Sequence, residues 1–127
     1  MNTTDLRIGN YVLYEGHVIR VKNISTQSIN LEFDKEDYRV IKWIPAKDLE
    51  ALSLSTEVLE NMGFKYSYSS MMYNISNLTI YLKRKVNTYY LSIEREHKDV
   101  AIITSVHQLQ NVMFSLFGVE LYLRRMF

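Results

Sequence analysis

The chain has 127 residues, 47% of them hydrophobic and 23% charged, and a formal net charge of +1 at pH 7. This composition is typical of a globular protein with one ordinary domain or two small ones, so it excludes a disordered or collagen-like chain. A near-neutral chain is also a poor candidate for strong, sequence-blind nucleic-acid binding unless its charges are segregated in space, because such binding neutralises phosphates.

The absence of cysteine excludes disulfides, thiolate nucleophiles and cysteine-based zinc sites. The sequence starts without the basic and apolar regions of a signal peptide, and it contains no run of about 18 apolar residues. We therefore expect a cytoplasmic protein without membrane contact. The unusual feature is the ten tyrosines, which suit half-buried sheet faces and binding surfaces alike because the ring is apolar and the hydroxyl polar.

Short strands separated by tight turns fill the first part of the chain. Glu15-Gly16 separates two of them as a hairpin turn would, and Pro45 ends another because it has no N–H for the ladder. A single helical turn is expected at 46–49. The predicted strands are residues 11–14, 17–22, 28–33, 38–44 and 51–54. This pattern predicts a small SH3-like β-barrel over residues 1–54.

Residues 55–127 are predicted to begin with a short linker helix, because Ser55 is a good N-cap and Gly63 can take the left-handed conformation that ends a helix. An antiparallel β-meander of three or four strands follows, since apolar and polar residues alternate between 64 and 104. A last short strand is expected at 120–123. The predicted fold class is α+β, with the two parts packed as one unit.

One long amphipathic helix is expected at 106–117, packed on the meander. Ser105 and Gln108 form an S-x-x-Q capping box, and Gly118 can end the helix. The spacing predicts one buried apolar side and one polar side in water. The expected apolar side is Val106, Leu109, Val112, Met113, Leu116 and Phe117, and the expected polar side is Gln108, Gln110, Asn111 and Ser115.

Catalytic, metal and cofactor sites are not expected. His17, His97 and His107 are not spaced as metal ligands, and no nucleophile motif or glycine-rich phosphate loop occurs. Glu94 and Glu96 could form a carboxylate pair, but the basic residues around them favour a solvated, salt-bridged turn. We therefore expect a protein that is not an enzyme.

Two sets of residues are candidate binding surfaces. Aromatic and basic residues on a sheet can stack bases and track phosphates, although cross-strand tyrosine pairs with lysines at an edge are also common in ordinary sheets. The candidate nucleic-acid set is Tyr81, Lys83, Arg84, Lys85, Tyr89, Tyr90, Arg124 and Arg125. Aromatic residues and methionines are enriched at protein interfaces, and the alternative for such a segment is an edge strand packed under the barrel. The candidate protein-binding set is Tyr66, Tyr68, Met71, Met72 and Tyr73.

Three short motifs resemble a family of small uncharacterised proteins from Bacteroidetes genomes, prophages and mobile elements. They are residues 5–10, residues 54–59 followed by Gly63-Phe64, and residues 106–111 running on to 116–121. Val58 stands where the family usually has an aromatic residue. The family has no assigned activity, so the resemblance implies no site residues. What it implies is an accessory protein of phage or mobile-element origin.

Two function hypotheses follow. The first is a non-enzymatic interaction protein that binds a host protein or ribonucleoprotein complex, for example as an inhibitor of a defence system such as a CRISPR effector. The second is an RNA- or DNA-binding module that uses the basic, tyrosine-rich sheet face. The two differ in salt dependence, since phosphate contacts weaken steeply with salt and an aromatic protein interface responds little.

Overall fold

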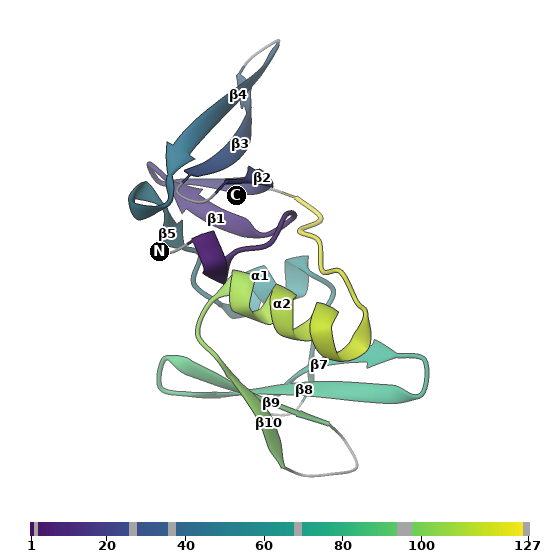
Figure 1. Ribbon diagram of the computed structural model, residues 1–127. Helices are drawn as coiled ribbons and strands as arrows, with labels where there is room; N and C mark the ends of the chain where they lie inside the picture. Colours follow the sequence, from purple (N-terminus) through teal and green to yellow (C-terminus); the bar gives the residue numbers. More distant parts are fainter. Residues whose placement is uncertain (2, 26–27, 36–37, 68–69, 94–97, 126–127) are drawn as a thin grey trace. The chain divides into compact units, whose positions relative to one another are not determined.

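The computed structural model describes residues 1, 3–25, 28–35, 38–67, 70–93 and 98–125, with the backbone alone for 30–35 and 38–41. These residues form an α+β fold with two antiparallel sheets and one main helix (Figure 1). The chain divides into two compact units. Unit 1 contains residues 1–52 and 105–111, and unit 2 contains residues 53–104 and 112–125. No helix in the described part of the chain is long and apolar enough to cross a membrane.

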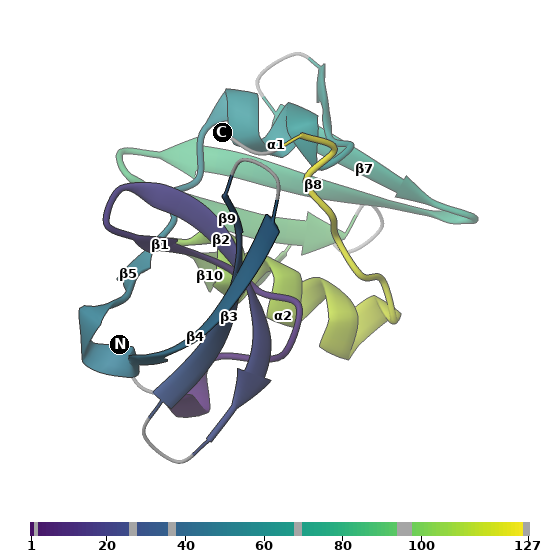
Figure 2. The same ribbon diagram turned by 90° about the horizontal axis from the view of Figure 1, so that it is seen from above.

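Unit 1 contains a five-stranded antiparallel sheet with the strand order β4-β3-β2-β1-β5. Its strands are β1 (Tyr11–Tyr14), β2 (His17–Ile24), β3 (Ser28–Lys35), β4 (Tyr38–Pro45) and β5 (Glu50–Ala51). Two 3₁₀ turns, η1 (Thr3–Asp5) and η2 (Ala46–Asp48), complete it. In Figure 2 the segment that holds η2 joins the edge strands β4 and β5. Among the described residues no pairing joins β4 to β5, so the ladder does not close into a barrel.

The first hairpin is confirmed. Tyr14 pairs with His17, and Glu15 and Gly16 both have positive φ, 49° and 79°. Positive φ at both loop residues gives a type I′ turn, whose twist matches that of the strands. Alternate residues of the strands then point inward and form the core of the unit. The buried core consists of Leu6, Val12, Ile19, Val21, Ile29, Ile44, Ala46 and Leu49.

Unit 2 contains a second five-stranded antiparallel sheet, with the strands in sequence order from β6 to β10. The meander has five strands, whereas three or four were expected. Its strands are β6 (Lys65–Ser67), β7 (Ser70–Ile75), β8 (Leu78–Lys85), β9 (Thr88–Ile93) and β10 (Asp99–Ile103). Figure 1 shows α1 (Thr56–Asn61) and the end of α2 (Val106–Phe117) on one side of this sheet.

Helix α1 has the predicted ends. The Ser55 hydroxyl accepts a hydrogen bond from the Val58 N–H at 3.2 Å, as an N-cap does. At the other end Gly63 has φ +103°, its N–H donates to the Glu60 carbonyl, and the Phe64 N–H donates to the Leu59 carbonyl. These two bonds are a Schellman motif, which satisfies carbonyls that the helix leaves open.

Helix α2 differs from the expected division into an apolar and a polar side. Val106, Leu109 and Met113 are buried as predicted, but Leu116 is 51% exposed. Gln110, which was expected to face water, is completely buried. Its side chain accepts from the Tyr11 N–H at 2.9 Å and donates to the Gly9 carbonyl at 3.0 Å, so backbone groups of unit 1 take the place of water.

The strand expected at 120–123 is absent, and that prediction is wrong. These described residues have no regular secondary structure, although Leu121 and Leu123 are buried as their alternation suggests. Arg124 and Arg125, which follow, bond to Asn61 of α1. The Arg125 backbone N–H donates to the Asn61 side-chain oxygen, and the Arg125 carbonyl accepts from the Asn61 side-chain amide at 2.7 Å. The Asn61 side chain thus bonds both backbone groups of Arg125, as a partner strand would.

Candidate functional site

The strand register in unit 2 sorts the side chains onto two faces of its sheet, because directly paired residues of neighbouring strands lie on the same face. Ile80 pairs with Tyr73 and Ile93, and Leu82 pairs with Met71 and Leu91. Ile80, Leu82, Met71 and Leu91 are all buried. This is the face that α1 and the end of α2 cover in Figure 1.

The opposite side of the sheet, which we call the open face, contains aromatic and basic residues from neighbouring strands. Tyr90 is the centre, since it pairs with Lys83 on β8 and with Ile102 on β10. Tyr81 is diagonal to Tyr90 and pairs with Met72 on β7 and Ser92 on β9. The open face includes Lys65, Met72, Tyr81, Lys83, Lys85, Tyr90, Ser92, Asp99 and Ile102.

The lysines of the open face are more exposed than its tyrosines. Lys65, Lys83 and Lys85 are exposed, Tyr81 and Tyr90 are half-buried, and Ile102 is 64% exposed. A tyrosine in this position holds its ring at the surface while its neighbours fix its orientation. The open face therefore offers ring surfaces for stacking and ammonium groups for anions.

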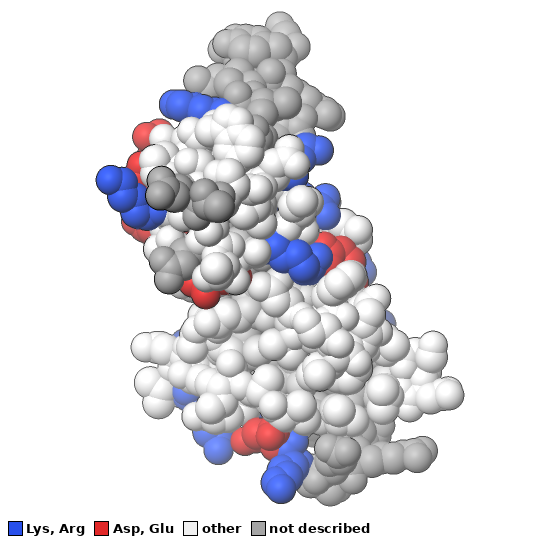
Figure 3. Space-filling view, viewed as in Figure 1, with Lys and Arg blue, Asp and Glu red and all other residues white. Residues whose placement is uncertain are grey.

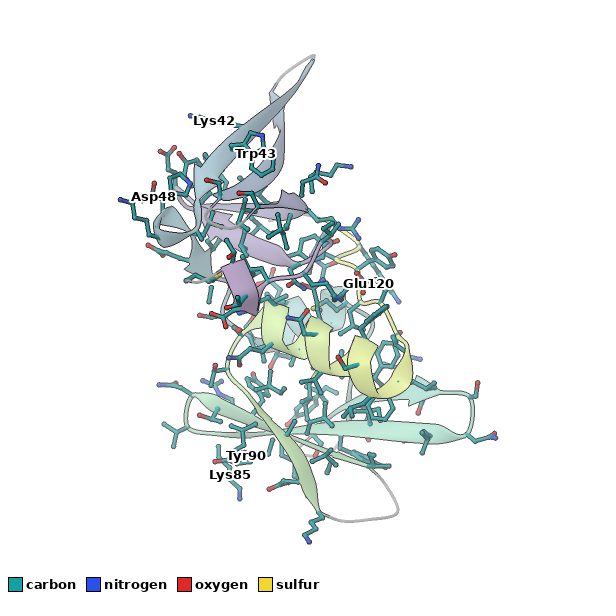
Figure 4. The ribbon with its side chains drawn as sticks, viewed as in Figure 1. Lys42, Trp43, Asp48, Lys85, Tyr90 and Glu120 are labelled. Atoms are coloured by element: carbon teal, nitrogen blue, oxygen red, sulfur yellow. The ribbon has the colours of Figure 1, made fainter. Side chains whose placement is uncertain are left out.

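Lys85 and Tyr90 are in direct contact. The Lys85 ammonium nitrogen lies 5.1 Å from the centre of the Tyr90 ring, and Figure 4 shows both side chains on the side of the sheet away from α1. A cation–π contact at an exposed site contributes only about 0.5–1 kcal/mol. The ammonium can therefore leave the ring for an anion at small cost.

The structure brings together four residues of the predicted nucleic-acid set and separates the others. Tyr81, Lys83, Lys85 and Tyr90 share the open face. Arg84 and Tyr89 pair with each other on the covered face, where Tyr89 is only 4% exposed. The last two members of the set, Arg124 and Arg125, are exposed in the tail that bonds to Asn61.

The predicted protein-binding set is dispersed. Tyr66 is 62% exposed on the edge strand β6, Met71 is buried, and Met72 lies on the open face. Tyr73 is half-buried against Phe64, with ring centres 5.0 Å apart. Tyr68 lies outside the described residues. Among the described members, only Tyr66 offers a large exposed ring.

The two described histidines, His17 and His107, belong to unit 1. His17 is exposed at the start of β2, and His97 lies outside the described residues, as do Glu94 and Glu96. His107 is buried with its Nδ1 3.2 Å from the Ser105 hydroxyl, and burial lowers its pKa although Asp5 opposes the shift. In the part of the chain that the structure describes, no three His, Cys, Asp or Glu side chains group as metal ligands would.

Lys65, Met72 and Ile102 belong to the open face but were not predicted as its members. Each lies on a different strand from Lys83 and Tyr90, so only the register connects them. Alternation along β8 does separate Lys83 and Lys85 from Arg84 in the sequence itself. A period of two along β8 would therefore have removed Arg84 from the predicted set. Across the two-residue turn at 86–87 the parity reverses, because Lys85 pairs with Thr88, and this places Tyr90 with Lys83 and Tyr89 with Arg84.

Unit 2 also exposes apolar side chains on α2 and in the tail that follows it. Phe114 and Leu116 of α2 and Tyr122 of the tail are each about half exposed. Figure 3 shows a broad area without charged side chains over this part of unit 2. We call these three residues the apolar patch.

Comparison with known proteins places the chain in no group, since no family model, curated protein or solved structure matches it.

Proposed function

We propose that unit 2 binds single-stranded nucleic acid on its open face and that the protein acts by binding, without turnover. The observation that carries this proposal is the presence of Tyr81 and Tyr90 beside Lys65, Lys83 and Lys85 on the face that the helices leave uncovered. Bases stack on tyrosine rings whatever their sequence, and lysines alongside them follow the phosphates.

The cation–π contact of Lys85 supports a simple exchange on binding. A base that stacks on Tyr90 takes the position near the ring that the Lys85 ammonium occupies. The ammonium is then free to contact the adjoining phosphate, and a charge-assisted contact to phosphate is stronger than the contact it replaces. The Tyr90 ring and the Lys85 ammonium would thus bind the base and the phosphate of one nucleotide.

The distribution of charge on the open face supports the proposal despite the near-neutral composition. Asp99 is the acidic residue on the open face among the described residues, against three lysines. The net charge of the whole chain is +1, whereas the described charged residues of the open face, three lysines and one aspartate, sum to +2. Phosphate binding depends on this local excess.

We also propose that unit 1 is an SH3-like, partly opened barrel. In a flat sheet, the edge strands β4 and β5 would lie about 19 Å apart, which is four strand spacings of about 4.8 Å. Residues 46–49 join these edges and include the 3₁₀ turn η2, so the connection spans about 13 Å. The short connection favours a sheet that curls toward closure. Fold alone assigns no activity to this unit.

A second proposal keeps the protein-interaction function. The resemblance to mobile-element proteins supports a chain that binds a host protein or ribonucleoprotein complex, for example to inhibit a defence system. The surface that favours it is the apolar patch of Phe114, Leu116 and Tyr122, because exposed apolar clusters mark protein interfaces.

A binding titration tests the first proposal. Fluorescence anisotropy of a labelled single strand is measured with the full chain between about 50 mM and about 200 mM salt. Neutralising phosphates with three lysines predicts a log–log salt slope of about −2, a loss of roughly 20-fold in affinity over this range. Lys83→Gln should make the slope shallower by about 0.7, whereas Lys47→Gln, an exposed lysine of unit 1, should leave it unchanged.

The aromatic contribution is tested in the same assay. Tyr90→Leu removes one stacking surface and should weaken binding by about 1–3 kcal/mol, or roughly 5- to 150-fold. Tyr66→Leu removes an exposed ring that does not lie on the open face and serves as the matched control. Equal losses for the two variants, or binding that ignores salt, would contradict the proposal and favour protein contact.

A further inference from the structure

The hairpin turn between β8 and β9 has an unusual backbone. Lys85 pairs with Thr88, so Val86 and Asn87 form a two-residue loop. Val86 has φ +59°, and Asn87 is not among the described residues with positive φ. This is the pattern of a type II′ turn, which favours glycine at its first position. Val86 therefore occupies a position that suits a residue without a Cβ.

Folding does not explain a valine in this place. A β-branched side chain at positive φ is strained, and the Val86 side chain is 86% exposed, so burial does not compensate for the strain. The turn at the other end of β8 has Ser76, with φ +38°, in the same place. Ser76 is polar and, unlike valine, is not branched at Cβ, as expected for a residue in an exposed turn. Strained residues of this kind concentrate at functional sites.

Positive charge flanks Val86 on both faces of the hairpin. Lys83 and Lys85 belong to the open face, whereas Arg84 points to the opposite face and its Nε donates to the Val86 carbonyl at 2.9 Å. This hydrogen bond holds the guanidinium beside the turn. The hairpin therefore ends in an apolar side chain with cations on either side.

The end of a base-paired segment is complementary to this arrangement. Its last base pair presents a flat, largely apolar surface, and a phosphate backbone runs along each side of it. We propose that the ligand of unit 2 is a nucleic acid in which a single strand leaves a base-paired end, with Val86 against the terminal base pair. Lys85 and Arg84 then face the two backbones, and the single strand continues over Tyr90 and Tyr81.

This inference rests on the proposed single-strand binding and names the class of ligand. An anionic lipid surface is the other polyanion that would suit an apolar tip with cations. The open face favours nucleic acid, because its aromatic and basic residues continue from the tip through Lys83 and Tyr90 to Tyr81, beyond the tip that a membrane would contact.

The test compares three labelled ligands in the anisotropy assay: a short single strand, a blunt duplex, and the same single strand as a 5′ or 3′ overhang on a duplex. The overhang ligand should bind about tenfold more tightly than the single strand, the effect expected from burying one valine side chain. Val86→Gly should remove this preference and leave single-strand affinity unchanged. Val86→Ile, which keeps an apolar branched side chain, should retain it.

Two controls separate the loss of contact from the loss of structure. Ser76→Gly makes a similar change in the other turn of β8 and should leave the preference intact. Val86→Gly should unfold at the same or a higher denaturant concentration, because glycine relieves the positive-φ strain.

The possible failures are distinguishable. Binding of the single strand with no preference for the overhang, or a preference that Val86→Gly does not change, overturns this inference and leaves the proposed function standing. Binding of none of the three ligands overturns both. Val86-dependent binding to phosphatidylserine-containing vesicles, without the overhang preference, would assign the tip to a membrane and also overturn the inference.

Discussion

Gln110 shows how a single polar side chain can be part of a core. Asn10 and Gln110 are both completely buried in unit 1, and the Asn10 amide lies 2.9 Å from the Asn111 side-chain oxygen. Asn111 in turn donates to the Asp5 carbonyl at 3.2 Å. A buried amide network of this kind is stable because its members satisfy one another. It joins residues 5–11 to α2, two segments that contain motifs of the family resemblance.

The first prediction concerns this network. Gln110→Leu removes the side chain that bonds the Tyr11 N–H and the Gly9 carbonyl, although the carbonyl still accepts from the Arg20 Nε at 3.3 Å. Losing a hydrogen-bond partner in a buried site costs about 1–3 kcal/mol, so we expect a loss of about 1–3 kcal/mol in the free energy of unfolding. Urea unfolding measures it. Gln108→Leu, at an exposed position of the same helix, should cost less than about 1 kcal/mol, and equal costs would show that the network is unimportant.

At the scale of elements, ends and turns were predictable because their causes are local. Ser55 and Gly63 fix the ends of α1, and Glu15-Gly16 fixes the first hairpin. The polar side of α2 was mispredicted because the partners of Gln110 are about 100 residues away in the sequence. The strand expected at 120–123 failed for a similar reason. Leu121 and Leu123 are buried as the alternation suggests, but these residues form no ladder with the described strands, and Asn61 binds the chain directly after them.

The second prediction compares two glycines that end helices. Gly63 has φ +103°, and a Cβ there would lie 3.4 Å from a carbon of the Tyr73 ring. Gly118 has φ +66°, close to the left-handed helical value, and a Cβ there would meet open space. Gly63→Ala should therefore cost about 2 kcal/mol and Gly118→Ala about 1 kcal/mol in unfolding free energy. Thermal unfolding of the two variants gives the comparison, and the reverse order would contradict this account.

For the whole molecule, the important property is how a near-neutral chain distributes its charge. The candidate site was partly predictable, since Tyr81, Lys83, Lys85 and Tyr90 came from local sequence and share one face. The contributions of Lys65 and Ile102 were not predictable, because they depend on which strands become neighbours. Composition alone could not show whether the charges are spread evenly or whether basic residues gather on the face of the sheet that the helices leave uncovered.

An amide NMR titration of the full chain with an unlabelled single strand tests the central claim most directly. If the open face is the binding surface, the amide signals of Tyr81, Lys83, Tyr90 and Ile102 should shift together and saturate with one affinity. Signals of the apolar patch, including Phe114 and Leu116, should stay in place. Shifts confined to the apolar patch, or no saturable shift on β8 and β9, would contradict the claim that this face binds nucleic acid.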